Sequence, residues 1–216
     1  MHSLSEENYL KSIFNLSQTG KKITPTAIAE SLGNNPASVV DMLKKLVEKK
    51  LIQYDKSKGA KLTDNGLKTA LDIVRKHRLW EVFLKEKLGY SWEEVHDIAE
   101  QLEHVHYEGL ADKLDKFLDF PEYDPHGDPI PQANGKMAKV YKTTLAEMEV
   151  KQVCRVVAVK DTGTAFLQYL KKLGIEIGSK ISLVEKIDYD DSIVILVDKG
   201  VKTTVSRKFA ESVLVI

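Results

Sequence analysis

Cysteine, aromatic residues and long apolar runs are all scarce in this sequence. Cys154 is the only cysteine among 216 residues, which excludes an internal disulfide framework and fits a reducing cytosol. Aromatic residues make up 7% of the chain, and no apolar run approaches the roughly 20 residues that a membrane span needs. The N-terminus has no cationic start followed by an apolar run, so we expect no secretory signal. These absences favour a cytoplasmic globular protein without a membrane partner.

The net charge of zero hides an asymmetry along the chain. Residues 1–75 contain 12 Lys or Arg and 8 Asp or Glu, residues 76–135 contain 6 and 14, and residues 136–216 contain 14 and 10. The acidic middle segment also holds five of the six histidines. A basic end beside an acidic, histidine-rich centre favours a polyanion-binding part joined to a cation-binding part.

Histidine and glutamate recur at the spacing of one helical turn in this middle segment. His77 and Glu81 are four residues apart and share a helix face with an apolar stripe. A second set falls within a narrow arc of the next expected helix: His96, Glu100, Glu103 and His104. Imidazole and carboxylate are the ligands of borderline-to-hard divalent metals. The pattern predicts a metal site, and the alternative is a solvated helix face.

The basic first part has the pattern of a helix-turn-helix with a wing. Ser5 is the expected N-cap of a first helix that ends near Leu16, and two short helices follow around residues 25–32 and 37–47. The second of these is amphipathic and rich in lysine, which is typical of a DNA-recognition helix. Residues 51–62 then predict a hairpin with lysines at its tip. A generic helical domain with a solvated hairpin is the alternative.

The rest of the chain changes character twice. A long helix is expected from Thr63 to Leu88, and a further one from Gly109 to Phe117. Residues 120–131 contain four of the six prolines and predict an irregular connector. Short β-branched runs follow at 150–159, 181–184, 192–197 and 212–216, with one helix expected at 164–173. This part predicts a small, mostly antiparallel barrel or sandwich.

Several motifs together resemble the diphtheria-toxin-repressor family of iron- and manganese-dependent transcriptional regulators. They are Glu7-Asn-Tyr-Leu10, Ile28-Ala-Glu-Ser-Leu32, Lys76-His-Arg-Leu79, Glu103-His104-Val105 and Pro125-His126-Gly127. The resemblance runs nearly end to end. It implies a mainly α fold with a small β domain: a winged helix-turn-helix domain at 1–72, a helical metal-binding and dimerisation domain with its connector at 73–140, and an SH3-like β-barrel at 141–216.

The resemblance also implies two metal centres. The first would use Asn8, Glu100, Glu103 and His104, with His77 as a further ligand. The second would use His77, Glu81 and His96, with Asp124, His126 and Asp161 as further ligands. Two positions depart from the family pattern, because members often have Asp or Met in place of Asn8 and Cys in place of Asp124.

Glu100 occupies the position where iron-type members tend to carry Cys and manganese-type members Glu. With no thiolate present, the donor set favours Mn²⁺, with Fe²⁺ as the alternative. Zn²⁺ or Co²⁺ would usually bind such a site more tightly than Mn²⁺, so we expect both to bind in vitro.

These features predict a metal-activated repressor that binds palindromic operator DNA as a homodimer and has no organic small-molecule substrate. We expect Asn35, Ser38 and Asp41 near base edges. The residues expected near phosphates are Thr26, Lys44, Lys45, Lys56, Lys58 and Lys61. The alternative is a metal-dependent hydrolase that activates water between carboxylates, although no nucleophilic triad is visible. A third possibility is a protein that only buffers metal ions, but such a protein would have no use for the lysines of the wing.

Overall fold

The computed structural model describes residues 2–198 and 200–216, which fall into two compact units. The first unit runs up to His77 and adds Glu100–Lys113 and Pro131–Lys136. The second contains Arg78–Ala99, Leu114–Ile130 and Met137–Ile216. In the described part of the chain, no helix has both the length and the apolar character needed to cross a bilayer.

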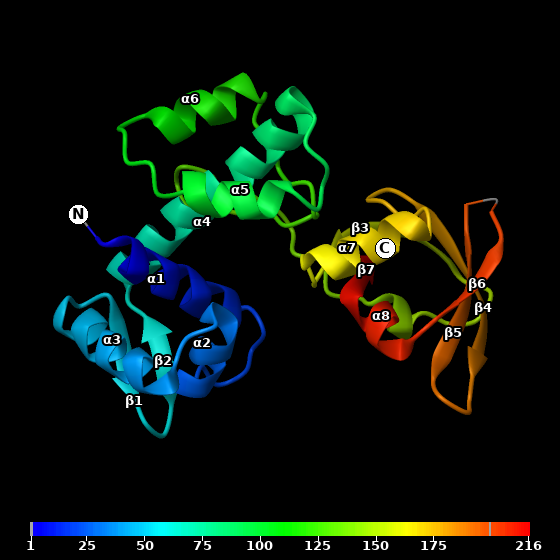
Figure 1. The fold of residues 1–216 in the computed structure, drawn as a ribbon, viewed down its shortest axis with the longest axis horizontal. Coiled ribbons are helices and arrows are strands. Elements are labelled where there is room, and N and C mark those ends of the chain that lie inside the picture. The colour runs from blue at the N-terminus through cyan, green and yellow to red at the C-terminus, as the bar shows by residue number, and fades with distance from the viewer. Residues whose placement is uncertain (1, 199) are drawn as a thin grey trace. The chain divides into compact units, whose positions relative to one another are not determined.

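The first unit begins with a winged helix-turn-helix (Figure 1). Its elements are α1 Leu4–Ser17, α2 Pro25–Leu32, α3 Pro36–Glu48, β1 Ile52–Asp55 and β2 Gly59–Leu62. Both α2 and α3 start with proline at the first turn, preceded by the side-chain caps Thr24 and Asn35. Leu10, Ile28 and Leu43, one from each helix, are fully buried, so the three helices share one core.

The first helix starts earlier than the expected cap at Ser5. Ser3 is the N-cap, and its hydroxyl accepts from the backbone N–H of Glu6 while the Glu6 carboxylate accepts from the backbone N–H of Ser3. This reciprocal capping box satisfies two helix-end donors, whereas Ser5 lies inside the helix. The expectation of Ser5 as the cap was therefore wrong by two residues.

Three further helices form the middle of the chain. They are α4 Asp64–Leu88, α5 Val95–Leu102 and α6 Leu110–Phe117. The hydroxyl of Thr63 accepts from the backbone N–H of Gly66 at 3.1 Å, which is the cap expected for the long helix. Because α4 runs through 25 residues, it carries His77 in the first unit and Glu81 in the second on one continuous helix.

The second unit contains an antiparallel five-stranded sheet with strand order β6-β5-β4-β3-β7 (Figure 1). Its strands are β3 Val153–Val159, β4 Lys180–Ile187, β5 Ser192–Val197, β6 Lys202–Val205 and β7 Val213–Val215. The shorter elements are η1 Leu145–Glu147, α7 Thr164–Lys172 and α8 Arg207–Ser212, and neither α8 nor β6 was expected. The mainly α fold with a small β domain is confirmed. Among the described strands β6 and β7 end the sheet, and the closed barrel is not shown.

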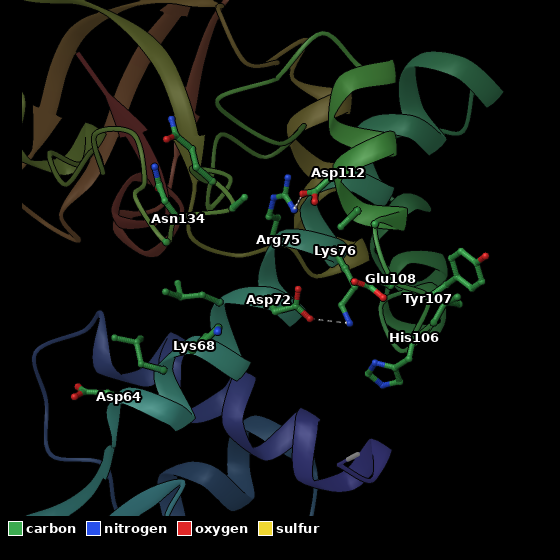
Figure 2. Close-up of a pocket in the computed structure, with 18 residues that line it drawn as sticks. Asp64, Lys68, Asp72, Arg75, Lys76, His106, Tyr107, Glu108, Asp112 and Asn134 are labelled. Atoms are coloured by element: carbon green, nitrogen blue, oxygen red, sulfur yellow. Dashed lines mark hydrogen bonds and ion pairs between the residues drawn. The ribbon is translucent and has the colours of Figure 1, made fainter.

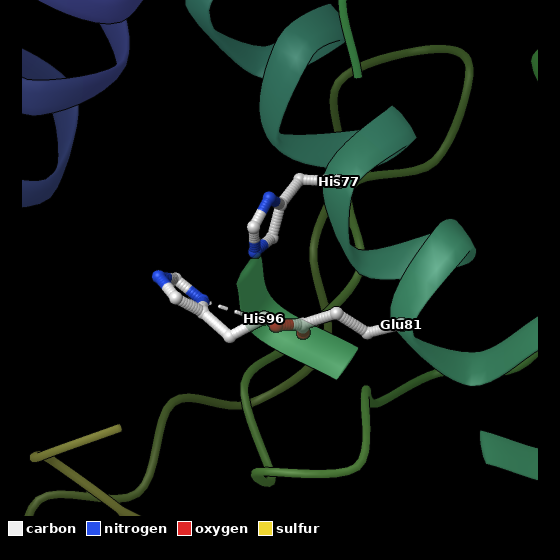
Figure 3. Close-up of side chains that lie close together, drawn as sticks. All are labelled: His77, Glu81 and His96. Atoms are coloured by element: carbon white, nitrogen blue, oxygen red, sulfur yellow. Dashed lines mark hydrogen bonds and ion pairs between the residues drawn. The ribbon is translucent and has the colours of Figure 1, made fainter. Parts of the chain in front are cut away.

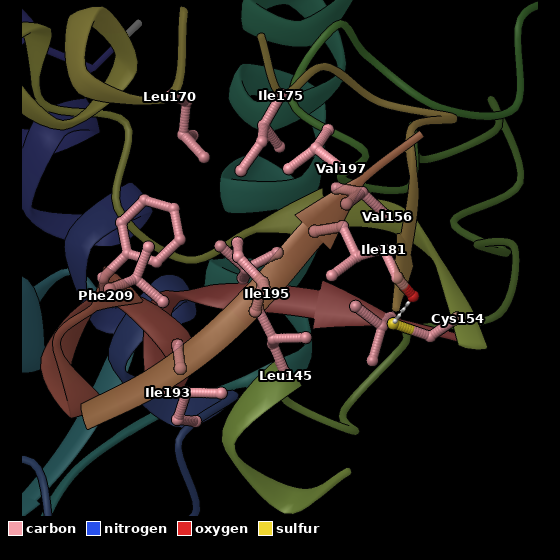
Figure 4. Packing of buried hydrophobic residues seen from close by; sticks show 14 of the residues in the cluster. Leu145, Cys154, Val156, Leu170, Ile175, Ile181, Ile193, Ile195, Val197 and Phe209 are labelled. Carbon is pink, nitrogen blue, oxygen red and sulfur yellow. Dashed lines mark hydrogen bonds between the residues drawn. The ribbon is translucent and has the colours of Figure 1, made fainter. Parts of the chain in front are cut away.

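The core of this sheet is apolar throughout. Figure 4 shows Val156, Ile181 and Ile195 from neighbouring strands packed with Phe209 of α8 and Leu170 of α7. Cys154 is buried in the same cluster, where its thiol donates to the carbonyl oxygen of Ile181 at 3.5 Å. Burial raises the pKa of the Cys154 thiol, so this cysteine is a packing residue.

The Pro-rich connector is fixed against β3. The backbone N–H of Val159 donates to the carbonyl oxygen of His126 at 3.0 Å. Gly127 has φ of +87°, and a Cβ atom there would lie 2.0 Å from the carbonyl oxygen of Val157. Only glycine fits so close to the strand, and this contact places His126 in the second unit.

Candidate metal centre and DNA-binding surface

A cluster of titratable side chains in the first unit joins α1 to two later segments. Helix α1 supplies Glu7 and Lys11, one turn apart on the same face. Helix α4 supplies His77, and the end of α5 with the residues after it supplies the rest of the cluster. Those residues are Glu100, Glu103 and His104.

Glu103 is at the centre of this cluster and is fully buried. Its Oε2 lies 2.7 Å from Nζ of Lys11 and 2.5 Å from Nδ1 of His77. The same Lys11 ammonium lies 2.5 Å from Oε1 of Glu100. Burial raises the pKa of the Glu103 carboxyl, but the hydrogen bond to His77 and the charge of Lys11 outweigh burial and hold this pKa below its usual range.

Two buried side-chain oxygen atoms of the first unit have no hydrogen-bond donor in the described part of the chain. Oε1 of Glu103 and Oδ1 of Asn8 are buried and accept no hydrogen bond among the described residues. Nε2 of His104 lies 3.6 Å from that Glu103 oxygen. Buried acceptors without partners are costly, and a divalent cation would satisfy them. The donors present therefore fit an oxygen- and nitrogen-binding metal, with no sulfur in the set.

A second cluster lies within the second unit, around the buried carboxylate of Glu81. Figure 3 shows Glu81 of α4 and His96 of α5 directed toward one another, with His77 one turn earlier on α4. Nδ1 of His96 is 3.3 Å from Glu81 Oε1, and Nδ1 of His126 is 3.4 Å from Glu81 Oε2. Glu81, Asp124 and His126 form one buried group of potential metal ligands.

The connector holds its two ligands through backbone groups. Nε2–H of His126 donates to the carbonyl oxygen of Trp92 at 3.0 Å, which leaves Nδ1 facing Glu81. Oδ1 of Asp124 accepts from the backbone N–H of His126 at 2.8 Å and of Asp128 at 3.0 Å. Its Oδ2 lies 3.4 Å from Nε of Arg78.

The acid–base state of this second cluster reflects its burial. Burial, with the nearby charges of Glu81 and Asp128, raises the pKa of Asp124 to about 7. Burial lowers the pKa of His126, but the contact with Glu81 outweighs burial and the net pKa is raised. Two buried carboxylates next to two imidazoles are chemically suited to hold a divalent cation.

Asp161, the remaining expected ligand, has a different setting. It is exposed, and its Oδ1 accepts from the backbone N–H of Gly163 at 2.9 Å. It belongs to none of the potential ligand groups found among the described residues. Its place in the second centre stays a prediction.

The expected DNA contacts all lie on exposed positions of the winged domain. Several are engaged locally: Asn35 Oδ1 accepts from the backbone N–H of Ala37 at 2.8 Å, and Ser38 Oγ donates to the carbonyl oxygen of Asn35 at 2.7 Å. Asp41 pairs with Lys44 at 3.0 Å. Asn35 therefore has a capping role in α3 beside any contact with a base.

Each segment of the chain matches a known family model. Residues 1–60 match the N-terminal DNA binding domain of iron dependent repressors, and residues 63–132 match their metal binding and dimerisation domain. Residues 143–216 match the FeoA domain. A manganese-dependent transcriptional repressor in complex with manganese has a TM-score of 0.90 at 31% identity, covering 98% of this chain and 99% of that one. ScaR with bound Zn²⁺ has a TM-score of 0.83 at 36% identity, covering 98% of each chain.

The chain belongs to the diphtheria-toxin-repressor family. This confirms the resemblance, and members of the family are metal-dependent transcriptional repressors rather than enzymes. The iron-dependent repressor IdeR of Mycobacterium tuberculosis (strain ATCC 25618 / H37Rv) is 34% identical over 125 residues, 58% of this chain and 54% of that protein. The chain thus spans about half the length of such curated relatives.

This member of the diphtheria-toxin-repressor family also has a cavity of about 730 Å³ beside α4 in its first unit. Figure 2 shows the cavity, with Arg75 paired to Asp112 at 2.7 Å and Lys76 paired to Asp72 at 3.2 Å. None of the expected metal ligands or DNA contacts lines it. Four acidic and three basic side chains line it, so its charge is nearly balanced.

Sequence reasoning missed three residues of the first cluster: Glu7, Lys11 and His106. Glu7 Oε1 lies 2.8 Å from Nε2 of His106, and Glu7 Oε2 lies 2.7 Å from Nδ1 of His104. A signal was available, because Glu7 and Lys11 occupy one face of a helix whose neighbouring positions are apolar.

Proposed function

We propose that this protein is a homodimeric repressor of metal-homeostasis genes that binds a palindromic operator when Mn²⁺ is bound, with Fe²⁺ as the alternative corepressor. The observation that carries the proposal is the contact of Lys11 and Glu7, both on the first helix of the winged domain, with Glu100, Glu103 and His104. A cation in this cluster acts on the DNA-binding domain through its own first helix.

Helix α1 also reaches the helix that would enter the major groove. The buried carboxylate of Glu6 lies 2.6 Å from Nζ of Lys49 and 3.7 Å from Nζ of Lys45. Lys45 is in α3, and Lys49 caps its end. Two adjacent residues of α1 thus contact different parts of the protein: Glu6 contacts α3, and Glu7 contacts the metal cluster. This arrangement supports a coupling between metal binding and the orientation of α3.

We assign the first centre to Asn8, Glu100, Glu103 and His104, with His77 at its edge because His77 contacts Glu103. A bound divalent ion would supply a charge of +2 to carboxylates that otherwise repel one another. The side chains of this chain set its geometry: Lys11 holds Glu100 and Glu103 together, while Glu103 Oε1 and Asn8 Oδ1 accept no hydrogen bond among the described residues.

We assign the second centre to Glu81, His96, Asp124 and His126, with Asp161 as a further ligand. Asp124 and His126 lie on the Pro-rich connector, which pairs with β3 through His126. A metal there would act as a clasp, because it ties α4 and α5 to the connector. Metal binding at this centre would stabilise the docked connector, and docking of the connector would favour metal binding. The two effects share one coupling free energy.

The structural relatives favour manganese over iron, and the donor set is compatible with both. All assigned donors are oxygen or nitrogen atoms, which suit Mn²⁺ and Fe²⁺, and Zn²⁺ or Co²⁺ would also bind in vitro. The structural relatives include proteins described as manganese-dependent or manganese-activated repressors, whereas IdeR is described as iron-dependent. Cellular metal supply would complete the selectivity.

A second copy of the chain would cover the exposed aromatic surface of the second unit. Phe117 and Phe120 are each 63% exposed, and Leu88 is 56% exposed. The ring of the half-buried Phe83 lies 6.1 Å from that of Phe117 between centroids, so these two rings are neighbours. Residues 63–132, which match a dimerisation domain, include all four. A two-fold dimer reads a palindrome with one α3 in each half-site.

Within each half-site Ser38 and Asp41, with Asn35, face base edges, and the exposed residues Thr26, Lys44, Lys45, Lys56, Lys58 and Lys61 face phosphates. The domain divisions at 1–72, 73–140 and 141–216 then correspond to DNA reading, metal binding with dimerisation, and the FeoA-like tail. A repressor of this kind would work in the cytoplasm.

The proposal is tested by selecting operator DNA from a random pool in the presence of Mn²⁺ and measuring retardation in a gel. We expect retardation of a palindrome at micromolar Mn²⁺ or anaerobic Fe²⁺ and none with a chelator. Sedimentation should give a dimer. Equal DNA affinity with metal and with chelator, in a protein that binds metal, would contradict the proposed function.

A further inference from the structure

We propose that Glu7 is the positioning residue of the first metal centre: it holds His104 through Nδ1 and thereby presents Nε2 of His104 to the metal. This inference rests on the proposed function, because it assigns a role to Glu7 within the proposed centre. It adds a residue of α1 that carries no ligand atom for the metal.

The contacts of Glu7 use both of its carboxylate oxygens. Oε2 lies 2.7 Å from Nδ1 of His104, and Oε1 lies 2.8 Å from Nε2 of His106. The Glu7 side chain is 2% exposed, while the side chains of His104 and His106 are 11% and 33% exposed. Glu7 is thus a buried carboxylate held between two imidazoles, with His106 on the solvent side.

The contact with Glu7 determines which nitrogen of His104 carries the proton. An ionised carboxylate only accepts hydrogen bonds, so the nitrogen facing it must be the N–H donor. A neutral imidazole has one N–H, and with the proton on Nδ1 the lone pair is on Nε2. The geometry therefore leaves Nε2 of His104 as a donor atom for a metal.

That free nitrogen lies beside an oxygen that also lacks a partner. Nε2 of His104 is 3.6 Å from Oε1 of Glu103, and this buried oxygen accepts no hydrogen bond among the described residues. Two lone pairs at this separation suit a shared cation, because neither group can donate to the other. The arrangement carboxylate, imidazole, metal is one that orients a ligand and raises its basicity.

Glu7 also explains how metal capture can reach the DNA-binding domain. A cation on Nε2 withdraws electron density from the imidazole, so Nδ1–H becomes a stronger donor to the Glu7 carboxylate. Glu7 is on α1, next to Glu6, whose carboxylate contacts Lys49 at the end of α3. Metal binding at His104 thus strengthens a hydrogen bond to the helix that touches α3.

The test begins with nitrogen NMR of the metal-free protein, which identifies the protonated nitrogen of each histidine. In the wild type we expect His104 to carry its proton on Nδ1. Glu7→Met keeps the length of the side chain but removes the acceptor, and should release His104 from this tautomer. Glu7→Gln keeps an acceptor oxygen and should retain it. His106→Ala leaves the Glu7–His104 contact in place and should also retain it.

Mn²⁺ affinity is then measured on the same four proteins by the electron paramagnetic resonance signal of free Mn²⁺. Loss of a group that orients a ligand typically weakens metal binding by about 10- to 100-fold, and we expect this for Glu7→Met. Glu7→Gln and His106→Ala should weaken Mn²⁺ binding much less than Glu7→Met does, because the hydrogen bond that orients His104 through Nδ1 remains.

Three results would overturn the inference. The first is that His104 of the wild type is protonated on Nε2. This result comes from the wild type alone, so it can be obtained even if Glu7→Met does not fold. The second is unchanged Mn²⁺ affinity in folded Glu7→Met. The third is a Glu7→Gln variant as weak as Glu7→Met, which would make Glu7 a direct ligand. If wild-type DNA binding ignores metal while His104 has the expected tautomer, the proposed function fails and the assignment of Glu7 stands.

Discussion

The two clusters of histidine and carboxylate side chains differ in the hydrogen-bond and ion-pair partners that these side chains already have. In the first, Lys11 of α1 bridges Glu100 and Glu103, and one oxygen of Glu103 accepts no hydrogen bond among the described residues. In the second, Asp124 is held by two backbone N–H groups and Arg78, and His126 is held by a backbone carbonyl. The first is arranged to respond to a cation, and the second is arranged to fix the connector.

The two clusters also differ in the direction of their carboxyl pKa values. The pKa of Glu103 is held low, since His77 and Lys11 outweigh burial, whereas burial raises the pKa of Asp124 to about 7. A carboxylate that is ionised beside a cationic side chain is ready to exchange that partner for a metal. A carboxyl that holds its proton near neutral pH must release it first.

The largest difference between the clusters should appear when each loses one carboxylate charge. Glu103→Gln removes the central ligand of the first cluster, so we expect metal-dependent DNA binding to fall by more than about 100-fold. Glu81→Gln removes the centre of the second and should weaken the response by only about tenfold. Gel retardation with added Mn²⁺ measures both, and circular dichroism checks folding.

Glu108→Gln is the matched control, because Glu108 is exposed and has the same change of charge. A Glu103→Gln variant that still binds operator only when metal is added would show that the first centre is misassigned. Asp161→Ala extends the comparison: a loss equal to that of Glu81→Gln would place Asp161 in the second centre, and no loss would leave it a turn residue.

A smaller effect is expected from the lysine that distinguishes the first cluster. Lys11→Met removes the ammonium between Glu100 and Glu103 but keeps an unbranched side chain. The carboxylates then attract a divalent ion without competition, and Mn²⁺ affinity should rise by about tenfold. Calorimetric titration measures this, with the exposed Lys21→Met as control. An unchanged or weaker affinity would mean that Lys11 organises the site more than it competes with metal.

The second cluster should dominate the pH dependence of stability near neutrality. The folded-state pKa of Asp124 is about 7, above its ordinary value of 3.8, so the folded protein holds this proton more tightly than the unfolded chain. The free energy of unfolding of metal-free protein should therefore fall as pH rises from about 4 to about 7.

The Asp124→Asn side chain cannot ionise, so the free energy of unfolding of this variant should depend less on pH between about 4 and about 7. Urea denaturation at a series of pH values, with chelator present, measures both proteins. Identical slopes for the variant and the wild type would assign the dependence to other groups, such as His126, whose pKa is also raised.

The smallest effects are expected at the wing, away from both clusters. Lys56→Ala and Lys58→Ala should each weaken DNA binding by a few-fold for all sequences and reduce the salt dependence by about one phosphate contact. Binding measured across a series of salt concentrations gives the slope. If neither variant changes it, the wing lies outside the interface.

The elements were predictable where local chemistry decides them. Proline after Thr24 and Asn35 marked the starts of α2 and α3, and the 3.6-residue period marked α4. The capping box at Ser3 was missed because two serines near the start both look like caps, and only the Glu6 contact distinguishes them. Strand β6 was missed because it is only four residues long, although Thr203, Thr204 and Val205 are β-branched, and pairing with β5 orders it.

The site was predictable in its residue types but not in its pairings. Spacing on one helix placed His77 near Glu81, yet the contact of His77 with Glu103 joins residues 26 positions apart. The roles of Lys11 and Glu7 depend on contacts 92 and 97 positions away in the sequence. No helical period encodes such contacts, because they arise from packing between helices.

The most direct test of the account is the affinity of Mn²⁺ for the first centre with and without operator DNA. If metal binding and DNA binding are coupled through α1, Mn²⁺ raises the affinity for operator DNA, and saturating operator raises the affinity for Mn²⁺. Both affinities must change by the same factor, on the order of 5- to 150-fold. We expect equal factors in the wild type and in the control Glu108→Gln, and factors near one in Glu103→Gln. A Mn²⁺ affinity in the wild type that is unchanged by operator would contradict it.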